Sequence, residues 1–384
     1  MADSRPRKKK LKKGHSFYQI RNRVNKHQDL VSRTVENLYS DEWITFCFVK
    51  LVRCNAAYSC CFSKAWCVTK RNLDETDESK RAIVRFPSLF DVDLVKQFMN
   101  DTDDIESRIT DSQLTAFKRL ADFLDTIDET ERVLKAWMHR AKKESVWATV
   151  LAVHVLRKLA VFNEMTIDSD YGYKQEECPC SCGTHINFGD NSIGHKDVWH
   201  GSLDILLGPV AVKVAPSDDE SSEESNSASE LESGELEECR NQIISQCIAF
   251  SYLQNAGLIP LVSLSKHSLK IFLFDPKSDM LYESLELDIF DEFGHISLTA
   301  IIVLWLVINH AVFCTGVKDS HEKLGYTSDF KSLVQEENPV LSVYEKDLHR
   351  SGLKHVNSTV WKYTALYNIH NHDNLFSLDV FDAE

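Results

Sequence analysis

Asp204 and Lys213 are the residues whose types and spacing most clearly suggest chemistry. They lie in the run WHGSLDILLGPVAVKV, residues 199–214, which predicts two short strands joined by a turn at Gly208–Pro209. Because side chains alternate along a strand, Asp204 and Lys213 are expected to project from adjacent strands on a shared face. That arrangement suits metal-dependent phosphodiester cleavage. The carboxylate would hold Mg²⁺, and the lysine would orient the attacking water or stabilise charge on the phosphate.

The spacing of these residues resembles the PD-(D/E)XK nuclease superfamily, and its RecB-like branch in particular. The core of that family runs helix, three strands, helix, strand, with a GxxD motif on the second strand and ExK on the third. Gly201–Asp204 match GxxD, and Lys213 stands at the position of the motif's lysine. The resemblance covers about residues 145–314. It implies an α/β protein with a restriction-endonuclease-like mixed sheet flanked by helices.

The helix expected at residues 239–255 extends the resemblance. It carries Gln242 and Gln246, as the QxxxY element of RecB-like nucleases would require, with Phe250 in place of the tyrosine. The resemblance therefore implies that these glutamines contact the substrate and join Asp204 and Lys213 in the catalytic set.

The catalytic set is incomplete at one position. Ala211 stands where the family has a glutamate, and an alanine cannot bind a metal. Mg²⁺ is usually held by one or two carboxylates with waters and phosphate oxygens. Glu238 and Glu144, on the helices that follow and precede the strands, are the carboxylates that could join Asp204 around the ion.

These residues predict a nuclease-related protein that acts through nucleic-acid or protein binding. If it is active, the reaction is metal-dependent phosphodiester hydrolysis. The alternative is a non-enzymatic scaffold or interaction protein. In that case the hairpin is purely structural, and Asp204 caps a neighbouring backbone group.

A second cluster of reactive residues lies just upstream of the hairpin. Cys178, Cys180, Cys182 and His185 have the ligand types of a tetrahedral zinc site. The segment is rich in glycine, so a metal could order it. Against zinc, the spacing has no CxxC pair, and three cysteines at alternate positions do not converge easily on one ion. The alternative is an exposed loop with incidental thiols.

The elements that must position these residues can be read from the apolar pattern. Helices are expected at 17–38, from Asp111 and Thr130, and at 145–163, and strands at 43–68, 198–207, 209–214, 258–264, 269–275 and 280–287. The apolar segment 298–313 is interrupted at Asn309, which favours a buried helix over a membrane span. The predicted organisation is a cysteine-rich α+β region at 15–110, a nuclease-like domain at 111–315 and a C-terminal extension at 316–384.

Composition and charge limit the partners. The 384 residues are 43% hydrophobic and 27% charged, which is typical of a globular protein, and the net charge of −14 argues against coating duplex DNA. Residues 1–14 are predicted to be a disordered basic tail with seven Lys or Arg, a possible nuclear localisation signal. Residues 215–238 are predicted to be a disordered acidic insert that carries ten Asp or Glu. Either segment could bind a protein partner, no membrane partner is expected, and a nuclear or cytoplasmic location fits the absence of a signal peptide.

Overall fold

The structure is a computed structural model of the full chain. It describes residues 16–40, 44–74, 83–100, 105–171, 176–215, 235–336, 338–354 and 356. The predicted basic tail at 1–14, residues 216–234 of the acidic insert predicted at 215–238 and most of the extension beyond 354 lie outside these residues. The last four residues of the predicted disordered insert are helical instead.

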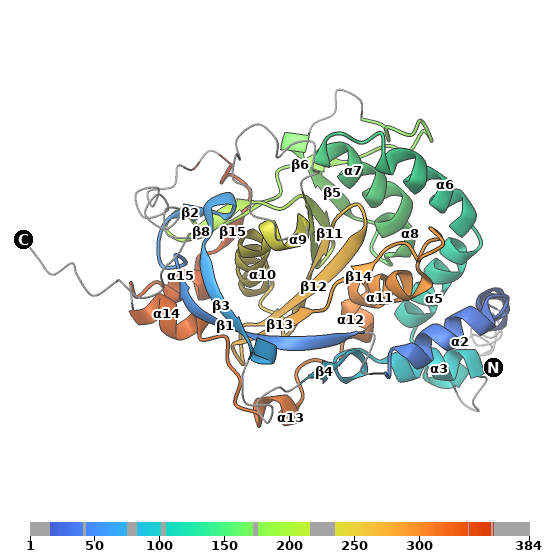
Figure 1. The fold of residues 1–384 in the computed structure, drawn as a ribbon, viewed down its shortest axis with the longest axis horizontal. Coiled ribbons are helices and arrows are strands. Elements are labelled where there is room, and N and C mark those ends of the chain that lie inside the picture. Colours follow the sequence, from blue (N-terminus) through green and yellow to red (C-terminus); the bar gives the residue numbers. More distant parts are fainter. Residues whose placement is uncertain are drawn as a thin grey trace, which may run out of the picture.

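A large mixed β-sheet forms the centre of the molecule (Figure 1). Its inner strands β10 and β11 are parallel neighbours, as a connection through a helix requires, whereas β9 is antiparallel to both β5 and β10. Across the sheet the described strands are β3 (Cys67–Arg71), β1 (Thr45–Cys54), β13 (Met280–Ser284), β12 (Ser268–Asp275), β11 (Ile259–Leu264), β10 (Val210–Val214), β9 (Ile205–Leu207), β5 (Met165–Asp168) and β6 (Phe188–Gly189), with β14 (Leu287–Asp288) beside β12 and β4 (Val84–Arg85) beside β1.

A small second sheet lies next to the cleft described below. Its strands, in order, are β15 (His349–Arg350), β7 (Ser192–Gly194), β8 (Trp199–Ser202) and β2 (Cys60–Cys61).

Helices surround the large sheet. Residues 16–25 are helical, and the helices after them are α2 (Gln28–Asn37), α3 (Val92–Asn100), α4 (Ile105–Arg108), α5 (Asp111–Leu124), α6 (Ile127–Met138), α7 (Glu144–Leu151), α8 (Arg157–Leu159), α9 (Glu235–Glu238), α10 (Arg240–Gln254), α11 (Leu298–Ile308), α12 (His310–Phe313), α13 (Asp319–Glu322), α14 (Phe330–Glu336) and α15 (Leu341–Lys346). A π-helical turn, Ala152–Leu156, joins α7 to α8.

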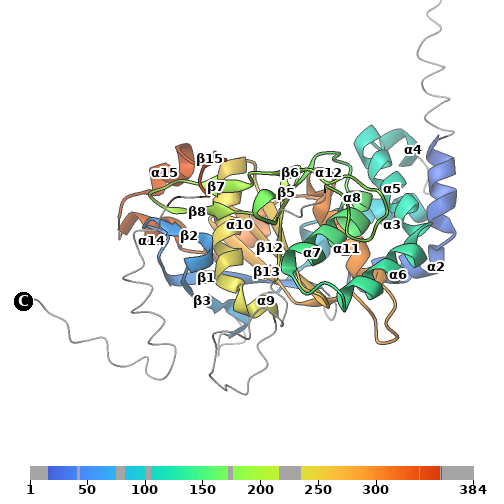
Figure 2. The same ribbon diagram turned by 90° about the horizontal axis from the view of Figure 1, so that it is seen from above.

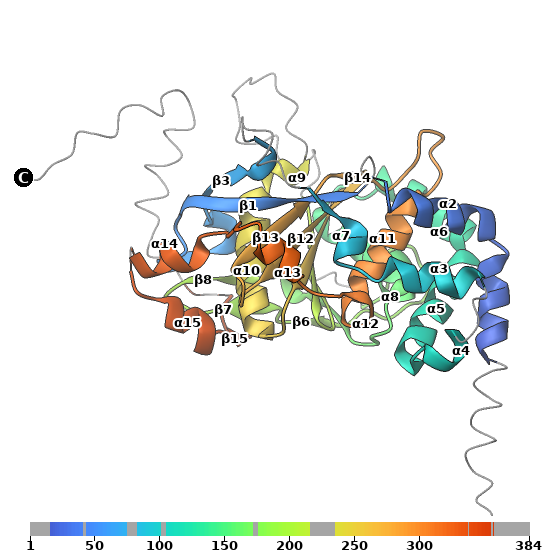
Figure 3. The same ribbon diagram turned by 90° about the horizontal axis from the view of Figure 1, so that it is seen from below.

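The two faces of the sheet are covered by different helices. Figures 1 and 2 show α10, α14 and α15 on one side, and α2, α3, α5–α8 and α11 on the other. Side chains alternate along β10 between two apolar clusters, one on each face of the sheet. Val210, Val212 and Val214 belong to the larger cluster, whereas Ala211 belongs to the cluster that includes α10. In Figure 3, β1 runs alongside β13 and β12, so strands from both sides of the predicted boundary at residue 110 belong to one sheet.

Most predicted elements are confirmed, including the mixed sheet flanked by helices. The hairpin of β9 and β10 turns at Gly208–Pro209, and Gly208 has a φ of +56° that favours glycine. Residues 300–308 of the apolar segment are fully buried in α11. None of the described helices combines the length and the apolar character that crossing a membrane requires.

One strand was predicted wrongly. The expected strand 198–207 is two strands, because the chain leaves the small sheet after Ser202 and enters the large sheet at Ile205. Gly201 has a φ of +137°, which side-chain-bearing residues rarely adopt, and it packs against Phe62. The helix boundaries also shift: Thr110, rather than Asp111, forms the capping box of α5.

A buried ionic cluster joins the outer strands to α10. The carboxylate of Glu283 on β13 is 1% exposed and pairs with Arg240 at 2.6 Å, with Lys270 at 2.7 Å and with Arg71 at 2.9 Å. Burial alone would raise the pKa of Glu283, but its bonds to these cations, led by Arg240, lower it to about 2. The cluster therefore connects β3, β12, β13 and α10 through one carboxylate.

We predict that Glu283→Gln lowers the free energy of unfolding by about 3–5 kcal/mol, because three cations would then face a neutral amide. The pKa of Glu283 is depressed by folding, so this contribution is present above its ordinary pKa near 4.5 and lost as the pH falls towards about 2. Urea denaturation at pH 7 and at steps down to pH 2 measures both effects. Glu292→Gln, at an exposed position, is the matched control. Equal stability of the two variants at pH 7 would contradict the assignment.

Candidate active site

Three charged residues form a row across adjacent strands. The registers of β9 with β5 and β10, continued by one residue, place Asp168 opposite Asp204 and Asp204 opposite Lys213. The backbone N–H of Asp168 donates to the carbonyl oxygen of Asp204 at 2.8 Å, which confirms this alignment. Residues directly opposite one another share a face, so the three side chains lie on the side of the sheet that α10 covers.

Lys213 is held between two carboxylates. Its Nζ lies 3.0 Å from Oδ2 of Asp204 and 2.8 Å from Oε1 of Glu144, and its side chain is 5% exposed. Burial alone would lower the pKa of Lys213, but Asp204 and then Glu144 outweigh this effect and raise it. Glu144 begins α7, whose position is fixed by Trp147: the indole N–H donates to the carbonyl oxygen of Ser265 at 3.1 Å, just beyond β11. The structure thus brings the predicted residues Glu144, Asp204 and Lys213 together.

Asp204 also closes the end of the hairpin. Its Oδ2 accepts a hydrogen bond from the backbone N–H of Val214 at 2.7 Å. Burial raises the pKa of Asp204, while the ammonium of Lys213 and this N–H oppose the rise. The carboxylate therefore caps a backbone group, which is one of the two roles that the sequence left open, and it also pairs with the lysine.

Asp168 is a site residue that the sequence analysis missed. It is fully buried, and its Oδ2 accepts from the backbone N–H of Asn191 at 3.1 Å. The ammonium of Lys354 lies 2.6 Å from Oδ1 of Asp168, 3.1 Å from Asp170 and 2.7 Å from Oγ of Ser169. One signal could have found it: the resemblance requires a first core strand, and MTID after the helix at 145–163 is a short alternating run that ends on this aspartate.

These side chains border a cleft of about 500 Å³. Its lining combines the polar row with residues of the small sheet and the segment after β15, among them Phe62, His200, Gln242, Asp168 and Lys354. Glu144, Asp168 and Asp204 are all largely buried and face two largely buried lysines, which leaves the inner site with one net negative charge. A buried site with this balance favours a cation or a ligand that brings one.

The other predicted residues have separate positions. Gln242 lines the cleft. Gln246 is fully buried instead, and its amide donates to the carbonyl oxygen of Ser202 at 2.9 Å, so it positions the segment that leads into Asp204. Glu238 is exposed on α9 and is not among the residues that line the cleft.

The upstream cysteines converge on a histidine that was not predicted. Nε2 of His154, in the π-helical turn, lies 3.0 Å from Sγ of Cys180 and 3.7 Å from Sγ of Cys178, and the ligand atoms of His154, Cys178, Cys180 and Cys182 all lie within 4.8 Å of one another. This cluster could bind a metal such as zinc. A signal existed here too, because His154 is a single imidazole in an otherwise apolar stretch of helix.

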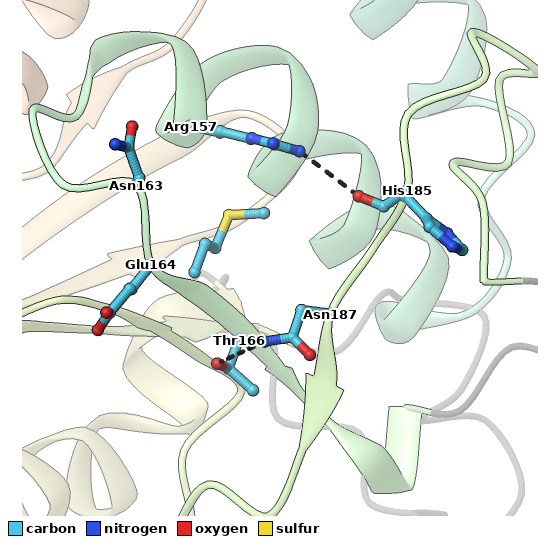
Figure 4. Close-up of a pocket in the computed structure, with 7 residues that line it drawn as sticks. Arg157, Asn163, Glu164, Thr166, His185 and Asn187 are labelled. Atoms are coloured by element: carbon cyan, nitrogen blue, oxygen red, sulfur yellow. Dashed lines mark hydrogen bonds between the residues drawn. The ribbon is translucent and has the colours of Figure 1, made fainter.

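The expectation that His185 is the fourth ligand is corrected. Its side chain is 74% exposed, its Nδ1 lies 2.5 Å from the carbonyl oxygen of Glu176, and its Nε2 lies 3.7 Å from the carboxylate of Glu176. Figure 4 shows Arg157 reaching the carbonyl oxygen of His185 while the imidazole points away from it. The histidine three residues after the third cysteine is therefore exposed and is not part of the cluster.

Comparisons with protein-family models, with curated proteins and with solved structures find no match for this chain. Function must accordingly be inferred from the chemistry of the cleft and of the cysteine cluster.

Proposed function

We propose that the cleft is a nuclease-type site that binds nucleic acid and hydrolyses its phosphodiester bonds with the help of a divalent cation. The observation that carries the proposal is the convergence of Asp168, Asp204 and Lys213 in one cleft. Glu144 binds the ammonium of Lys213 without lining the cleft itself. The order of the elements supports it: α7, β5, β9, β10, α10 and β11 follow the order helix, three strands, helix, strand of the PD-(D/E)XK core, with the short strands β6, β7 and β8 inserted between β5 and β9. This agreement supports a restriction-endonuclease-like fold as part of the proposal.

The donor set fits a hard divalent cation. The carboxylates of Asp168 and Asp204 line the same cleft from neighbouring strands, and carboxylate oxygens are the protein ligands that Mg²⁺ prefers. The ammonium of Lys354, held by oxygens of Asp168, Ser169 and Asp170, already occupies a cation position beside them. When bound, Mg²⁺ would polarise the phosphate and lower the pKa of the attacking water.

Lys213 contributes charge rather than proton transfer. Its raised pKa keeps it protonated at neutral pH, so it is not a general base there. An ammonium has three N–H donors, and two are directed at Glu144 and Asp204. The third can be directed to a phosphate oxygen or to the attacking water. Gln242 lines the same cleft and can hydrogen-bond the substrate.

A second candidate function is nucleic-acid binding without hydrolysis. It is favoured by Ala211, which removes the carboxylate two residues before Lys213, and by the hydrogen bond from Val214 that commits Oδ2 of Asp204 to the backbone. In this case the cleft would bind a phosphate together with its cation, with Lys213 as a further contact, and would not hydrolyse the bond. The protein would then act as a nuclease-related binding protein.

We expect the full chain to cleave labelled single- or double-stranded DNA or RNA with Mg²⁺ or Mn²⁺, and not with EDTA. Asp204→Asn and Lys213→Met should each reduce the rate by about 10²–10³-fold, because each removes a charge that acts on the reacting phosphate. Gel analysis of the products measures the rate, and circular dichroism checks folding. Lys196→Ala, an exposed lysine outside the cleft, is the control for general loss of positive charge.

The outcomes separate the two candidates. Cleavage that survives both cleft variants removes the site assignment. Absence of cleavage, with binding that Lys213→Met weakens and Lys196→Ala does not, supports the non-catalytic candidate.

Lys354 is predicted to compete with the cation. Lys354→Ala removes the ammonium next to Asp168 and Asp170, so titration calorimetry should show about threefold to tenfold tighter Mg²⁺ binding. Asp168 keeps its hydrogen bond from Asn191, so the carboxylate stays in place. Lys346→Ala, at an exposed position on α15, should leave the affinity unchanged. An unchanged Mg²⁺ affinity in Lys354→Ala would show that the cation does not use Asp168.

A further inference from the structure

We propose that His154, Cys178, Cys180 and Cys182 bind one Zn²⁺ ion, and that this ion fastens the connection between β5 and β6 to the helix formed by α7, the π-helical turn and α8. The proposal is independent of the proposed function, because it stands whether or not the cleft is catalytic.

The ligand atoms lie close enough together to surround one zinc ion after small side-chain adjustments. Ligands at the usual zinc distances stand about 3.5–3.8 Å apart around one ion. Sγ of Cys178 lies 3.3 Å from Sγ of Cys180, and Nε2 of His154 lies 3.0 Å from Cys180 and 3.7 Å from Cys178. A set of three thiols and one imidazole is characteristic of structural zinc, and soft thiolate ligands select zinc over Mg²⁺ or Ca²⁺.

The backbone of the loop explains how cysteines at alternate positions converge. Ser181 and Gly183 have positive φ values of 63° and 72°, so the chain does not continue as an extended strand in which alternate side chains would stay far apart. The backbone N–H of Ser181 donates to the carbonyl oxygen of Cys178 at 3.0 Å, and that of Cys178 donates to Thr184 at 3.0 Å. The loop therefore closes on itself and directs the three thiols to one side.

The fourth ligand comes from a distant and rigid element. His154 is 6% exposed and lies in the π-helical turn Ala152–Leu156. π-helical turns are rare and occur frequently at functional sites, where they re-aim a side chain. Here the turn directs Nε2 of His154 at the thiols. A set of four protein ligands leaves no open position for substrate, which indicates a structural ion.

The ion would add to the contacts that hold this segment, in whose described part Cys178 and Ile186 are buried in the apolar core. Between β5 and β6 the chain is held to the helix by Arg157, whose guanidinium reaches the carbonyl oxygen of His185 at 3.4 Å (Figure 4). The same connection leads through β6 to Asn191, whose backbone N–H binds the carboxylate of Asp168. Zinc would thus fix the middle of a segment whose two ends, Asp168 and Asn191, are joined by this hydrogen bond.

Metal analysis of the full chain tests the proposal directly. The protein purified under reducing conditions without chelator should contain about one zinc ion per chain by inductively coupled plasma mass spectrometry. The metal-free chain should take up one Co²⁺ with the visible absorption of tetrahedral cobalt and the charge-transfer bands of thiolate ligation. Zn²⁺ should then displace the Co²⁺.

Variants assign the ligands. Cys182→Ser changes an exposed side chain and should preserve the fold, yet reduce bound zinc and the thiolate charge-transfer bands. His154→Gln should reduce zinc content as well. His185→Ala and Cys314→Ser, which change a histidine and a cysteine outside the cluster, should keep a full complement of zinc. The zinc-free chain should also be cut faster by protease within residues 176–187.

Three results would overturn the proposal. The first is a full chain that neither contains zinc nor takes up Zn²⁺ or Co²⁺ when metal-free. The second is retention of zinc by Cys182→Ser together with its loss in His185→Ala. The third is a mass two hydrogens lower under reducing conditions, with a Cys178–Cys180 disulfide in the peptide map, because these thiols could not then bind an ion.

Discussion

A row of polar side chains crosses the apolar sheet beneath α10. The buried charges in this row require partners, and the surrounding elements supply them. The registers align Asp168, Asp204, Lys213, Ser263 and Lys270 across five adjacent strands. Buried charges are costly unless they are paired and hydrogen-bonded. Lys354, Glu144 and Glu283 pair the charged members of the row. Arg240, in the first turn of α10, also binds Glu283 and so ties the helix to one end of the row.

The two ends of the row have different partners. At one end Lys270 binds Glu283, the carboxylate that also holds Arg240 of α10 and Arg71 of β3. At the other end Lys354, from the chain beyond β15, binds Asp168. The N-terminal strands and the segment after β15 are therefore attached to the ends of the same polar row. This explains why residues far apart in the sequence enclose one cleft.

The sequence predicted the parts of the site that depend on local pattern. Asp204 and Lys213 belong to a hairpin with a two-residue turn. The alternation of side chains along its strands and the position of the turn determine that they face one another. The sequence marks Asp168 and His154 only as single polar residues in apolar runs. Their partners, and the place of Lys354, could not be predicted in this way because they are brought together by tertiary contacts. His185 was chosen for its closeness in sequence to the cysteines, but the backbone turns at Ser181 and Gly183 direct it elsewhere.

For the fold, too, the sequence predicted the features that follow a local pattern and not those that depend on pairing between distant segments. Strands and helices in which apolar residues recur at a regular spacing were predicted, because burial of one face imposes that spacing. The break between Ser202 and Ile205 was not found, because a strand that changes sheets keeps its alternation while its partners change. The pairing of β1 with β13 was also beyond a local analysis, since it joins segments more than two hundred residues apart through a register that only the folded sheet defines.

The alanine at position 211 does not leave Asp204 as the single carboxylate of the row. In the nuclease superfamily that the sequence resembles, a glutamate stands at this position, on the same strand as the lysine. Here the alanine packs under α10, and the additional carboxylate comes from Asp168 on the far side of Asp204. A cation shared by Asp168 and Asp204 would then lie between β5 and β9 rather than beside β10. Lys354 already places an ammonium against Asp168 there, and Lys213 stays with Glu144 on the opposite side of Asp204. Under the proposed function, the cation and the lysine would approach a phosphate from opposite sides of one carboxylate.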